Sequence, residues 1–377
     1  MPVLDHAAVR ALFPHTAAQT YLNHAATGVY STRVVDALEA DIADRHGRAV
    51  DNFAQVLPQT EAALDRLARS LGTVRDRVEF TANTTEALSV LAEGLDWQPG
   101  DRIALPACEF PANVYPFLHL ERKGVGVDFI PHRDGTFSLD DVAAVLTPRT
   151  RLVTVSWVQF LSGFRVDVAA LADLVHAHGA LLAVDAVQGH GVLQLDAVRS
   201  GVDFLAGGAQ KWWMGPQGIG YLYLTEAVQE RITPRAGWLN VPVKWDDFFA
   251  YDLRFHPDAR RFRLGTLNHM GALGFGAALK QVEDFGPYAI EAHVLGLSRR
   301  LRENLDRLGL ACYGSDDEAH ASGIVTFRHP RPDALVEALA SERITVSARN
   351  RLVRVSPTWT NTDDDLARML DAVQRFG

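Results

Sequence analysis

The strongest constraint on the fold is an alternation of short apolar segments with amphipathic segments between residues 78 and 224. The apolar segments have strand length and are rich in Val, Ile, Leu and Phe, whereas the segments between them carry apolar residues at helical spacing. Strands that alternate with helices form parallel sheets with helices packed on their faces. The sequence therefore predicts an α/β fold with one seven-stranded, mostly parallel sheet, whose strands span 78–80, 102–107, 127–131, 151–158, 180–187, 202–207 and 218–224.

A change of pattern after this region predicts a second domain. Residues 233–268 are irregular and rich in aromatic residues and arginine, and two long helical stretches follow them. Short strands and helices then alternate to the end of the chain. A chain of 377 residues is too long for one ordinary core. We therefore expect a large domain over 15–268 and a smaller α+β domain over 269–377 that also takes in residues 1–14.

Bulk properties exclude several kinds of partner. The net charge of −9 disfavours nucleic acid and anionic membranes, which both require a basic surface. Two cysteines, Cys108 and Cys312, provide neither a disulfide framework nor a cysteine-rich zinc site, and the 14 histidines show no metal-binding spacing. No stretch approaches the roughly 20 apolar residues of a membrane span, and the N-terminus lacks the features of a signal peptide. We expect a cytoplasmic protein without a metal, acting on a small molecule.

Lys211 stands in an apolar context, within the stretch GGAQKWWMGPQGIG that begins at Gly207. Burial disfavours the charged ammonium and lowers its pKa, which makes the amine a usable nucleophile. Alternatively, the side chain covers apolar surface with its stem while the ammonium reaches water. This stretch alone leaves both interpretations open.

Other polar side chains occur where predicted strands end, which is where open parallel sheets bind ligands. Asp185 closes one strand and is followed by Gln188, Gln159 follows another strand, and Thr84 and Thr85 open a helix. Each has an ordinary explanation as a cap or a loop amide. Together, however, they match pyridoxal phosphate, which requires a lysine amine for its aldehyde, a carboxylate for its ring nitrogen and an anion site for its phosphate.

At these residues the sequence resembles the class V aminotransferase family of fold-type I pyridoxal phosphate enzymes, which includes cysteine desulfurases, kynureninase and isopenicillin N epimerase. The resemblance extends from about Tyr21 to Thr362. It implies the fold-type I architecture, pyridoxal 5′-phosphate as the cofactor, and a Schiff base on Lys211. The cofactor-binding residues that it implies are Thr84, Thr85, Phe110, Gln159, Asp185, Gln188, Gln210, Lys211 and Thr266.

Individual motifs carry these assignments to the cofactor. FTANTTEAL is similar to the family's phosphate loop and includes Thr84, and in EFPANVYP Phe110 takes the place of the residue that stacks on the ring. Gln159 in SWVQFLSG matches an asparagine position near the ring hydroxyl. In DAVQG, the resemblance implies that Asp185 pairs with the ring nitrogen and that Gln188 contacts the ring oxygen.

Further motifs imply a substrate side and a second subunit. YLNHAATG is similar to the family's substrate-side turn and assigns His24 and Ala25 to the substrate, while VRVSPTWTNT assigns Arg354 to a substrate carboxylate. In RLGTLN, Thr266 matches a threonine that binds the phosphate of the neighbouring subunit, which implies a homodimer with shared active sites. Gln210 stands where many relatives have a histidine that touches the phosphate.

The loop before Arg354 departs from the desulfurase pattern. Desulfurases carry a persulfide-forming cysteine there, but the corresponding ITVSARNRLVRVS contains none. We therefore do not expect desulfurase activity by that mechanism, and the Trp212–Trp213 pair is more similar to the epimerase-like branch. Arg349 in this loop is compatible with a substrate contact or with a surface position. We expect His190, in the small-residue turn after Gln188, on the surface, and a position lining the crevice is the alternative.

These observations predict an enzyme that acts at the α-carbon of an amino acid or a related amine, with Lys211 also serving as general base. The family label favours transamination, whereas C–S lyase or epimerase activity is compatible with the same residues. A hypothesis of another class is a non-catalytic binding protein that retains the fold. The presence of the whole set of predicted cofactor residues argues against it.

Overall fold

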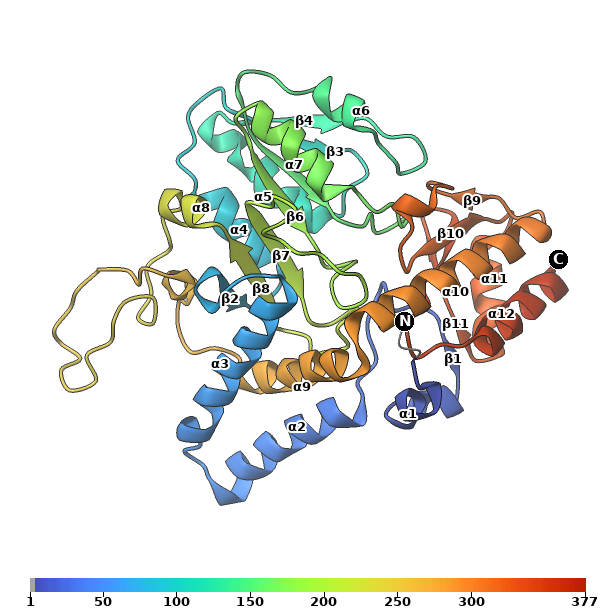
Figure 1. Cartoon of the computed structure of the whole chain (residues 1–377), viewed down its shortest axis with the longest axis horizontal. Coiled ribbons are helices and arrows are strands. Elements are labelled where there is room, and N and C mark those ends of the chain that lie inside the picture. The colour runs from blue at the N-terminus through green and yellow to red at the C-terminus, as the bar shows by residue number, and fades with distance from the viewer. Residues whose placement is uncertain (1–3) are drawn as a thin grey trace.

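The computed structural model describes residues 4–377, and the predicted sheet forms the centre of its larger part (Figure 1). In sheet order the strands are β2 (Val78–Thr81), β8 (Gly220–Leu224), β7 (Phe204–Gly208), β6 (Leu181–Asp185), β5 (Thr150–Ser156), β3 (Arg102–Pro106) and β4 (Gly126–Ile130). In this sheet β8 runs antiparallel to its neighbours β2 and β7, and the other strands all run in the opposite direction to β8. The prediction of a seven-stranded, mostly parallel sheet is confirmed.

Both faces of this sheet are apolar because helices cover both of them. Along β6, Leu182 and Val184 belong to one hydrophobic core, whereas Leu181 and Ala183 belong to another. The first core also takes in residues of α2 (Thr32–Ala43), α3 (Phe53–Ser70), α6 (Leu139–Ala143), α7 (Val168–Ala177) and α9 (His269–Phe285). The second takes in residues of α4 (Thr84–Gly94), α5 (Tyr115–Leu118) and α8 (Glu226–Arg231).

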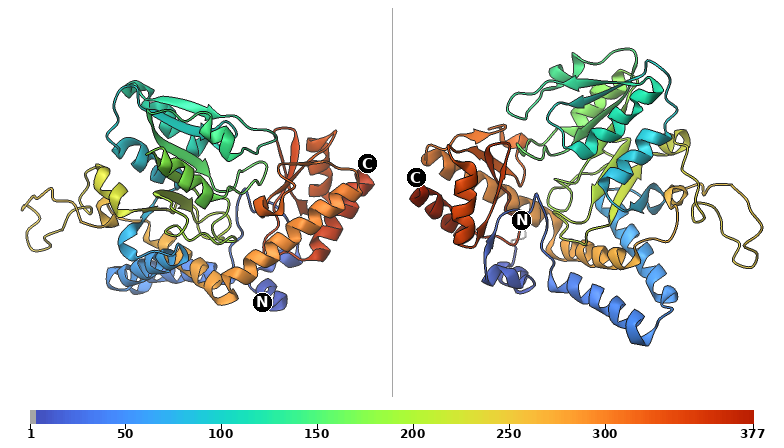
Figure 2. Two further views of the ribbon diagram at one scale, coloured as in Figure 1. Left: turned by 45° about the horizontal axis from the view of Figure 1, so that its top comes forward. Right: turned by 180° about the vertical axis from the view of Figure 1, so that it is seen from behind.

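The smaller part is an antiparallel sheet packed against helices, as Figure 2 shows from two further sides. Its strands, in sheet order, are β12 (Ser347–Arg349), β13 (Leu352–Val355), β10 (Val325–Arg328) and β9 (Cys312–Tyr313), and its helices include α11 (Pro332–Ser341) and α12 (Asp363–Phe376). The helix α10 (Pro287–Arg307) joins the two parts, because Ile290 and Val294 lie in the first core while Leu301 and Leu305 lie in a third core within the smaller part.

The N-terminal segment packs on the smaller part before the chain enters the larger one. After α1 (His6–Ala11), strand β1 (Thr20–Tyr21) pairs in parallel with β11 (Ile344–Thr345), and Asn23 forms a bridge with Ser356. These contacts extend beyond residue 14, the expected end of the N-terminal piece of the small domain. The division at 15 and 268 stays a prediction, and residues 1–3 lie outside the described residues.

The loop between α8 and α9 extends away from the rest of the molecule (Figures 1 and 2). We call residues 238–253 of this loop the aromatic arm. Large apolar side chains on it are strongly exposed, with 69% for Trp245, 82% for Phe249 and 86% for Tyr251. Burial of such side chains is the main driving force of folding and association. An exposed group of them is typical of a surface that another molecule covers.

Beyond the arm, a buried ion-pair network attaches the chain to the sheet edge. Arg263 lies 3.0 Å from the carboxylate of Glu79, which is fully buried in β2, and 2.9 Å from that of Glu61. Arg75 contributes a second guanidinium to the same acids. Because Thr266 follows three residues after Arg263, this network also holds the segment that carries Thr266.

Removal of one partner from a buried pair leaves an uncompensated charge, which costs about 3 kcal/mol of unfolding free energy. We expect Arg263→Ala to lose about that amount in urea denaturation. The matched control is Arg235→Ala, whose pair with Glu93 is 45% and 39% exposed, and which should lose less than about 1 kcal/mol. Equal losses in both variants would contradict a special role for the buried network.

Candidate active site

Most of the predicted residues lie around one edge of the sheet, whereas Thr266 does not. Asp185 ends β6 and pairs there with Ser156 at the end of β5 and with Ala206 in β7. Lys211 follows the end of β7, three residues after Gly208. Since the carboxyl ends of parallel strands share one edge, the topology brings these side chains together.

Lys211 is half-buried and faces groups from three other elements. Its Nζ lies 5.5 Å from the ring centroid of Phe110, which follows β3. Burial lowers the pKa of Lys211 to about 8, the charge of Asp185 opposes this shift, and the charge of Arg354 adds to it. The structure therefore places a weakly basic amine near an aromatic ring, within the electrostatic influence of a carboxylate and a guanidinium.

A close contact with Gly28 holds the segment that carries Lys211 in place. The N–H of Gly28 donates to the carbonyl of Gln210 at 2.8 Å, and a Cβ on Gly28 would lie 2.1 Å from the Lys211 carbonyl oxygen. Only glycine allows this approach. The predicted substrate-side turn thus packs directly against the lysine.

Asp185 is buried with one carboxylate oxygen unpaired. Its Oδ1 accepts from the N–H of Val187 at 2.9 Å, whereas Oδ2 has no hydrogen-bond partner within residues 4–377. Burial, above all, raises the pKa of Asp185 to about 7. A buried carboxylate with a free oxygen is suited to a cationic N–H donor, such as the protonated ring nitrogen of pyridoxal phosphate.

The amides of Gln188 and Gln159 are both oriented by neighbours. Gln188 donates to the carbonyl of Ala25 at 3.0 Å and accepts from the indole of Trp212 at 2.9 Å. Gln159 donates to Glu109 at 2.8 Å, so its buried Oε1 is left without a partner in the described part of the chain. The expected contacts of both amides with the cofactor ring stay predictions.

Glu109 is a buried residue to which sequence reasoning assigned no role. Its carboxylate accepts from the N–H and from the hydroxyl of Ser156, each at 2.5 Å, in addition to the Gln159 amide. Burial raises the pKa of Glu109, and its charge contributes to the raised pKa of Asp185. Its position directly before Phe110 at the end of a strand was the signal that could have identified it.

The start of α4 is the part of the site at which the sequence predicts phosphate binding. Asn83 caps this helix by accepting from the N–H of Glu86 at 2.9 Å, so the alternative that Thr84 or Thr85 is the N-cap is wrong. Thr84 is buried and its hydroxyl has no partner among residues 4–377, whereas Thr85 is exposed. A Cβ on Gly208 would lie 3.1 Å from that hydroxyl and 2.4 Å from Gln210 Oε1, so both polar groups border one small space.

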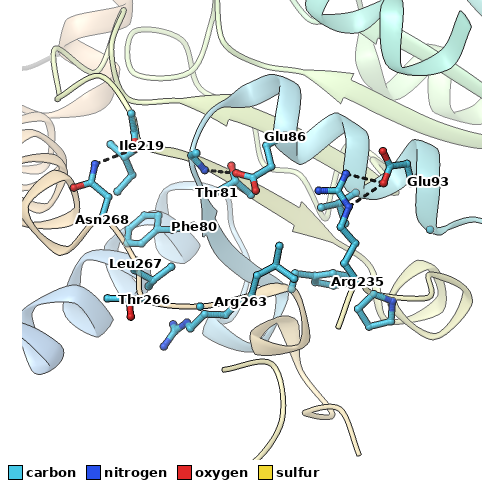
Figure 3. A pocket seen from close by; sticks show the side chains of 18 of the residues that line it. Phe80, Thr81, Glu86, Glu93, Ile219, Arg235, Arg263, Thr266, Leu267 and Asn268 are labelled. Carbon is cyan, nitrogen blue, oxygen red and sulfur yellow. Dashed lines mark hydrogen bonds and ion pairs between the residues drawn. The ribbon is translucent and has the colours of Figure 1, made fainter. Parts of the chain in front are cut away.

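Thr266 lies apart from this set, in a pocket of about 320 Å³ at the base of the aromatic arm. Figure 3 shows Thr266 with Thr81 and Asn268 around this pocket. Neither Lys211 nor Asp185 lines it. The assignment of Thr266 to a neighbouring subunit's phosphate stays a prediction.

Arg354 and His24 are the residues predicted to line the substrate side, and their roles stay predictions. Arg354 in β13 donates to the carbonyl of Phe160 at 2.7 Å, and burial lowers its pKa to about 10, with the charge of Arg349 adding to the shift. His24 is buried beside the carbonyl of Ser356, and burial lowers its pKa to about 3, so its imidazole is neutral. Ala25 N–H donates to the Ser356 hydroxyl at 3.0 Å, which ties the turn to β13.

His190 is buried rather than exposed, so the expectation of a surface position is wrong. Its Nδ1 lies 2.7 Å from the Tyr221 hydroxyl, and its ring packs 4.7 Å from that of Trp213. His190 is buried in a short turn, and no pattern in the sequence indicated that it packs against Tyr221 and Trp213.

Five of the predicted residues carry buried polar atoms without a partner within residues 4–377. Such atoms cost about 1–3 kcal/mol each, so a cluster of them indicates a ligand. Their chemistry fits pyridoxal phosphate with an amino acid substrate: a hydroxyl, an amide oxygen, a carboxylate oxygen, an imidazole nitrogen and a guanidinium nitrogen. The atoms are Thr84 Oγ1, Gln159 Oε1, Asp185 Oδ2, His24 Nε2 and Arg354 Nε.

Comparison with known proteins finds a matching family and similar sequences. The model of the aminotransferase class-V family matches residues 20–369. A probable cysteine desulfurase of Pyrococcus abyssi is 30% identical over 351 residues, which cover 90% of this chain and 86% of that protein. A probable cysteine desulfurase of Methanothermobacter thermautotrophicus is 30% identical over 271 residues, which cover 71% of this chain and 66% of that protein.

Solved structures of the protein C-DES share the fold. A complex of this cystine C–S lyase with its reaction product cysteine persulfide has a TM-score of 0.90 at 24% identity, covering 97% of this chain and 100% of that one. A second structure, with glycine covalently linked to its pyridoxal phosphate cofactor, has a TM-score of 0.91 at 24% identity, covering 98% and 99%.

Two observations concern other kinds of site. None of the helices in residues 4–377 combines the length and the apolar character that a membrane crossing requires. The same residues contain no group of three or more His, Cys, Asp or Glu side chains arranged to hold a metal ion.

The lowered pKa of Lys211 predicts how cofactor uptake depends on pH. Only the neutral amine attacks an aldehyde, so the rate at which cofactor-free protein takes up pyridoxal phosphate should rise with pH and reach half its plateau near pH 8. Stopped-flow measurement of the visible absorbance tests this. In Asp185→Asn the midpoint should move to lower pH, because the charge of Asp185 raises the pKa of Lys211. A midpoint near 10, the ordinary lysine value, would contradict the buried site.

Proposed function

This chain belongs to the class V aminotransferase family of pyridoxal phosphate-dependent enzymes, and we propose that it removes the α-proton of an amino acid with Lys211 as the base. The observation that carries the proposal is the placement of the Lys211 amine beside Phe110, Asp185 and Arg354. A pKa of about 8 leaves a useful fraction of this amine neutral near neutral pH.

The residues proposed to hold the cofactor span the site from end to end. Thr84, Thr85 and Gln210 would bind its phosphate, Phe110 would cover one face of its ring, and Asp185 would accept a hydrogen bond from its ring nitrogen. When bound, pyridoxal phosphate supplies an aldehyde that condenses with an amine and a ring that takes up the electron pair released at the α-carbon. By keeping the ring nitrogen protonated, Asp185 makes the ring a better electron acceptor.

The residues on the substrate side would bind the substrate and orient it toward Lys211. Arg354 is fixed at the Phe160 carbonyl and has a free Nε, so it can bind the α-carboxylate through its remaining N–H groups. The neutral imidazole of His24 and the backbone of Ala25 would line the same space. A carboxylate held in this way orients the α-proton toward Lys211, which lowers the entropic cost of proton transfer.

Within this chemistry we favour C–S bond cleavage. The relatives at 30% identity are described as probable cysteine desulfurases, and the C-DES neighbour is a cystine C–S lyase. The hairpin before Arg354 has no cysteine to receive sulfur, and the two cysteines of the chain lie elsewhere. Sulfur would therefore leave on the product rather than on the protein.

The proposed reaction balances as a β-elimination. Lys211 takes the α-proton, the Cβ–S bond breaks, and the sulfur leaves with the bonding electron pair and a proton as a thiol or persulfide. The remaining aminoacrylate reacts with one water to give pyruvate and ammonium. No oxidant or reductant is required.

The test is a panel of amino acids with C–S bonds, followed for pyruvate and for the released sulfur compound. We expect Lys211→Ala to lose at least about 10³-fold in rate, because the base is removed, and to retain its far-UV circular dichroism. Amine transfer to a keto acid, or loss of chirality without pyruvate, would instead support transamination or epimerisation. A protein that takes up no pyridoxal phosphate would contradict the enzyme proposal and leave a binding protein.

We also propose a homodimer with shared active sites. Thr266 is exposed at the base of the aromatic arm, and the most exposed aromatic side chains of the arm have no cover within this chain. A second copy that packs on the arm would bury them and could bring Thr266 to the neighbouring phosphate site.

The double variant Phe249→Ser/Tyr251→Ser should weaken this dimer. Loss of two buried aromatic rings costs several kcal/mol of association free energy, so light scattering after size exclusion should show a shift toward monomer at micromolar concentration. The matched control is Tyr288→Ser, which removes a side chain that is 73% exposed on α10 and should stay dimeric. A wild-type chain that is monomeric at this concentration would contradict the proposal.

A further inference from the structure

One face of the β12–β13 hairpin carries two arginines that point to the same side. The strand register pairs Ser347 with Arg354 and Arg349 with Leu352, and directly paired residues share a face of the sheet. The alternate residues, among them Val353, face the third hydrophobic core. Arg349 and Arg354 therefore lie on the opposite face.

This face is turned toward the active-site loop of the larger part. Arg354 pairs with Thr326 in β10, and the Thr326 hydroxyl donates to the carbonyl of Leu161 at 2.5 Å. Arg354 itself donates to the carbonyl of Phe160. Since Gln159 belongs to the cofactor site, the hairpin face borders the space in which a substrate would extend away from the cofactor.

Neither arginine is neutralised. Within residues 4–377, no carboxylate lies within 4.0 Å of Arg349 or Arg354. Other arginines of this acidic chain do form ion pairs. Two like charges on one small face repel each other, and the charge of Arg349 contributes to the lowered pKa of Arg354. The buried hydroxyl of Ser347 on the same face also has no partner there.

We propose that Arg349 forms a second anion subsite, which makes the preferred substrate an amino acid whose side chain ends in a carboxylate. This inference rests on the proposed function, because Arg354 takes the α-carboxylate. Arg349 then pairs with the distal carboxylate, and the Ser347 hydroxyl is placed to donate to bound anion or water. A ligand with two negative charges relieves the repulsion between the guanidinium groups, whereas a ligand with one charge leaves Arg349 uncompensated.

Two ligands of nearly equal shape separate this charge effect from size. S-carboxymethylcysteine and its amide, S-carbamoylmethylcysteine, both carry a C–S bond and differ only in the distal carboxylate. With the cofactor-loaded enzyme, we expect the acid to bind about tenfold more tightly than the amide, the size of one charge-assisted hydrogen bond. Dissociation constants come from titration of the visible absorbance.

Arg349→Gln should remove this preference by weakening binding of the acid about tenfold while the dissociation constant of the amide changes less than about twofold. The preference of the wild type should also shrink with added salt, because Arg349 is exposed and screened. The matched control is Arg343→Gln, which removes another exposed arginine, outside the hairpin, and should keep the preference. Equal affinities for acid and amide in the wild type, or a preference that survives in Arg349→Gln, would overturn the subsite.

A second pair of ligands tests the subsite without any amine chemistry. Glutarate and its monoamide cannot condense with an aldehyde, so calorimetry on the purified protein reports on the two arginines alone. A preference for glutarate that Arg349→Gln abolishes would support the subsite even if the protein took up no pyridoxal phosphate, the result that would overturn the proposed function. Equal binding of both ligands to a cofactor-loaded, active enzyme would overturn the subsite alone.

Discussion

The close approach of Gly28 to the Lys211 carbonyl is the contact on which the rest of the site depends. It presses the N-terminal turn against the segment that carries the lysine, and Ala25 in the same turn contacts both Gln188 and Ser356. One turn therefore links the end of β6, the lysine and the C-terminal strand β13. Residues from the beginning, the middle and the end of the chain can form one site only because this turn lies between them.

The site contains buried polar groups whose hydrogen bonding and charge a bound ligand would satisfy. Buried atoms of Asp185, Gln159 and Thr84 lack partners in the part of the chain that the structure describes, and a lysine and an arginine both have lowered pKa values. Each of these unpaired or buried charged groups lowers the stability of the free protein. Large apolar cores on both faces of the sheet compensate for this cost, which is typical of a rigid scaffold that holds a strained functional site.

The sequence predicted the parts of the site that depend on local pattern. Asp185 and Thr84 were visible because each stands at the end of an apolar run or at the start of a helix, and Lys211 because its neighbours are apolar. The sequence could not predict the parallel pairing of Thr20 with Ile344, since such a contact joins segments more than 300 residues apart and leaves no local periodicity. The roles of Glu109 and the buried position of His190 also depend on tertiary packing, which local pattern does not encode.

The charge of the whole chain and the charge of its site have opposite signs, and this contrast has a physical consequence. A net charge of −9 repels anionic amino acids at long range, but salt screens that repulsion within about 10 Å. Within residues 4–377, no carboxylate lies within 4.0 Å of Arg354 or Arg349, the two arginines proposed to bind the substrate. Burial of Arg354 strengthens its attraction for an anion. Affinity for an acidic amino acid would therefore be decided by a few side chains on one hairpin, and a change there could redirect the enzyme to another substrate without altering the chemistry at Lys211.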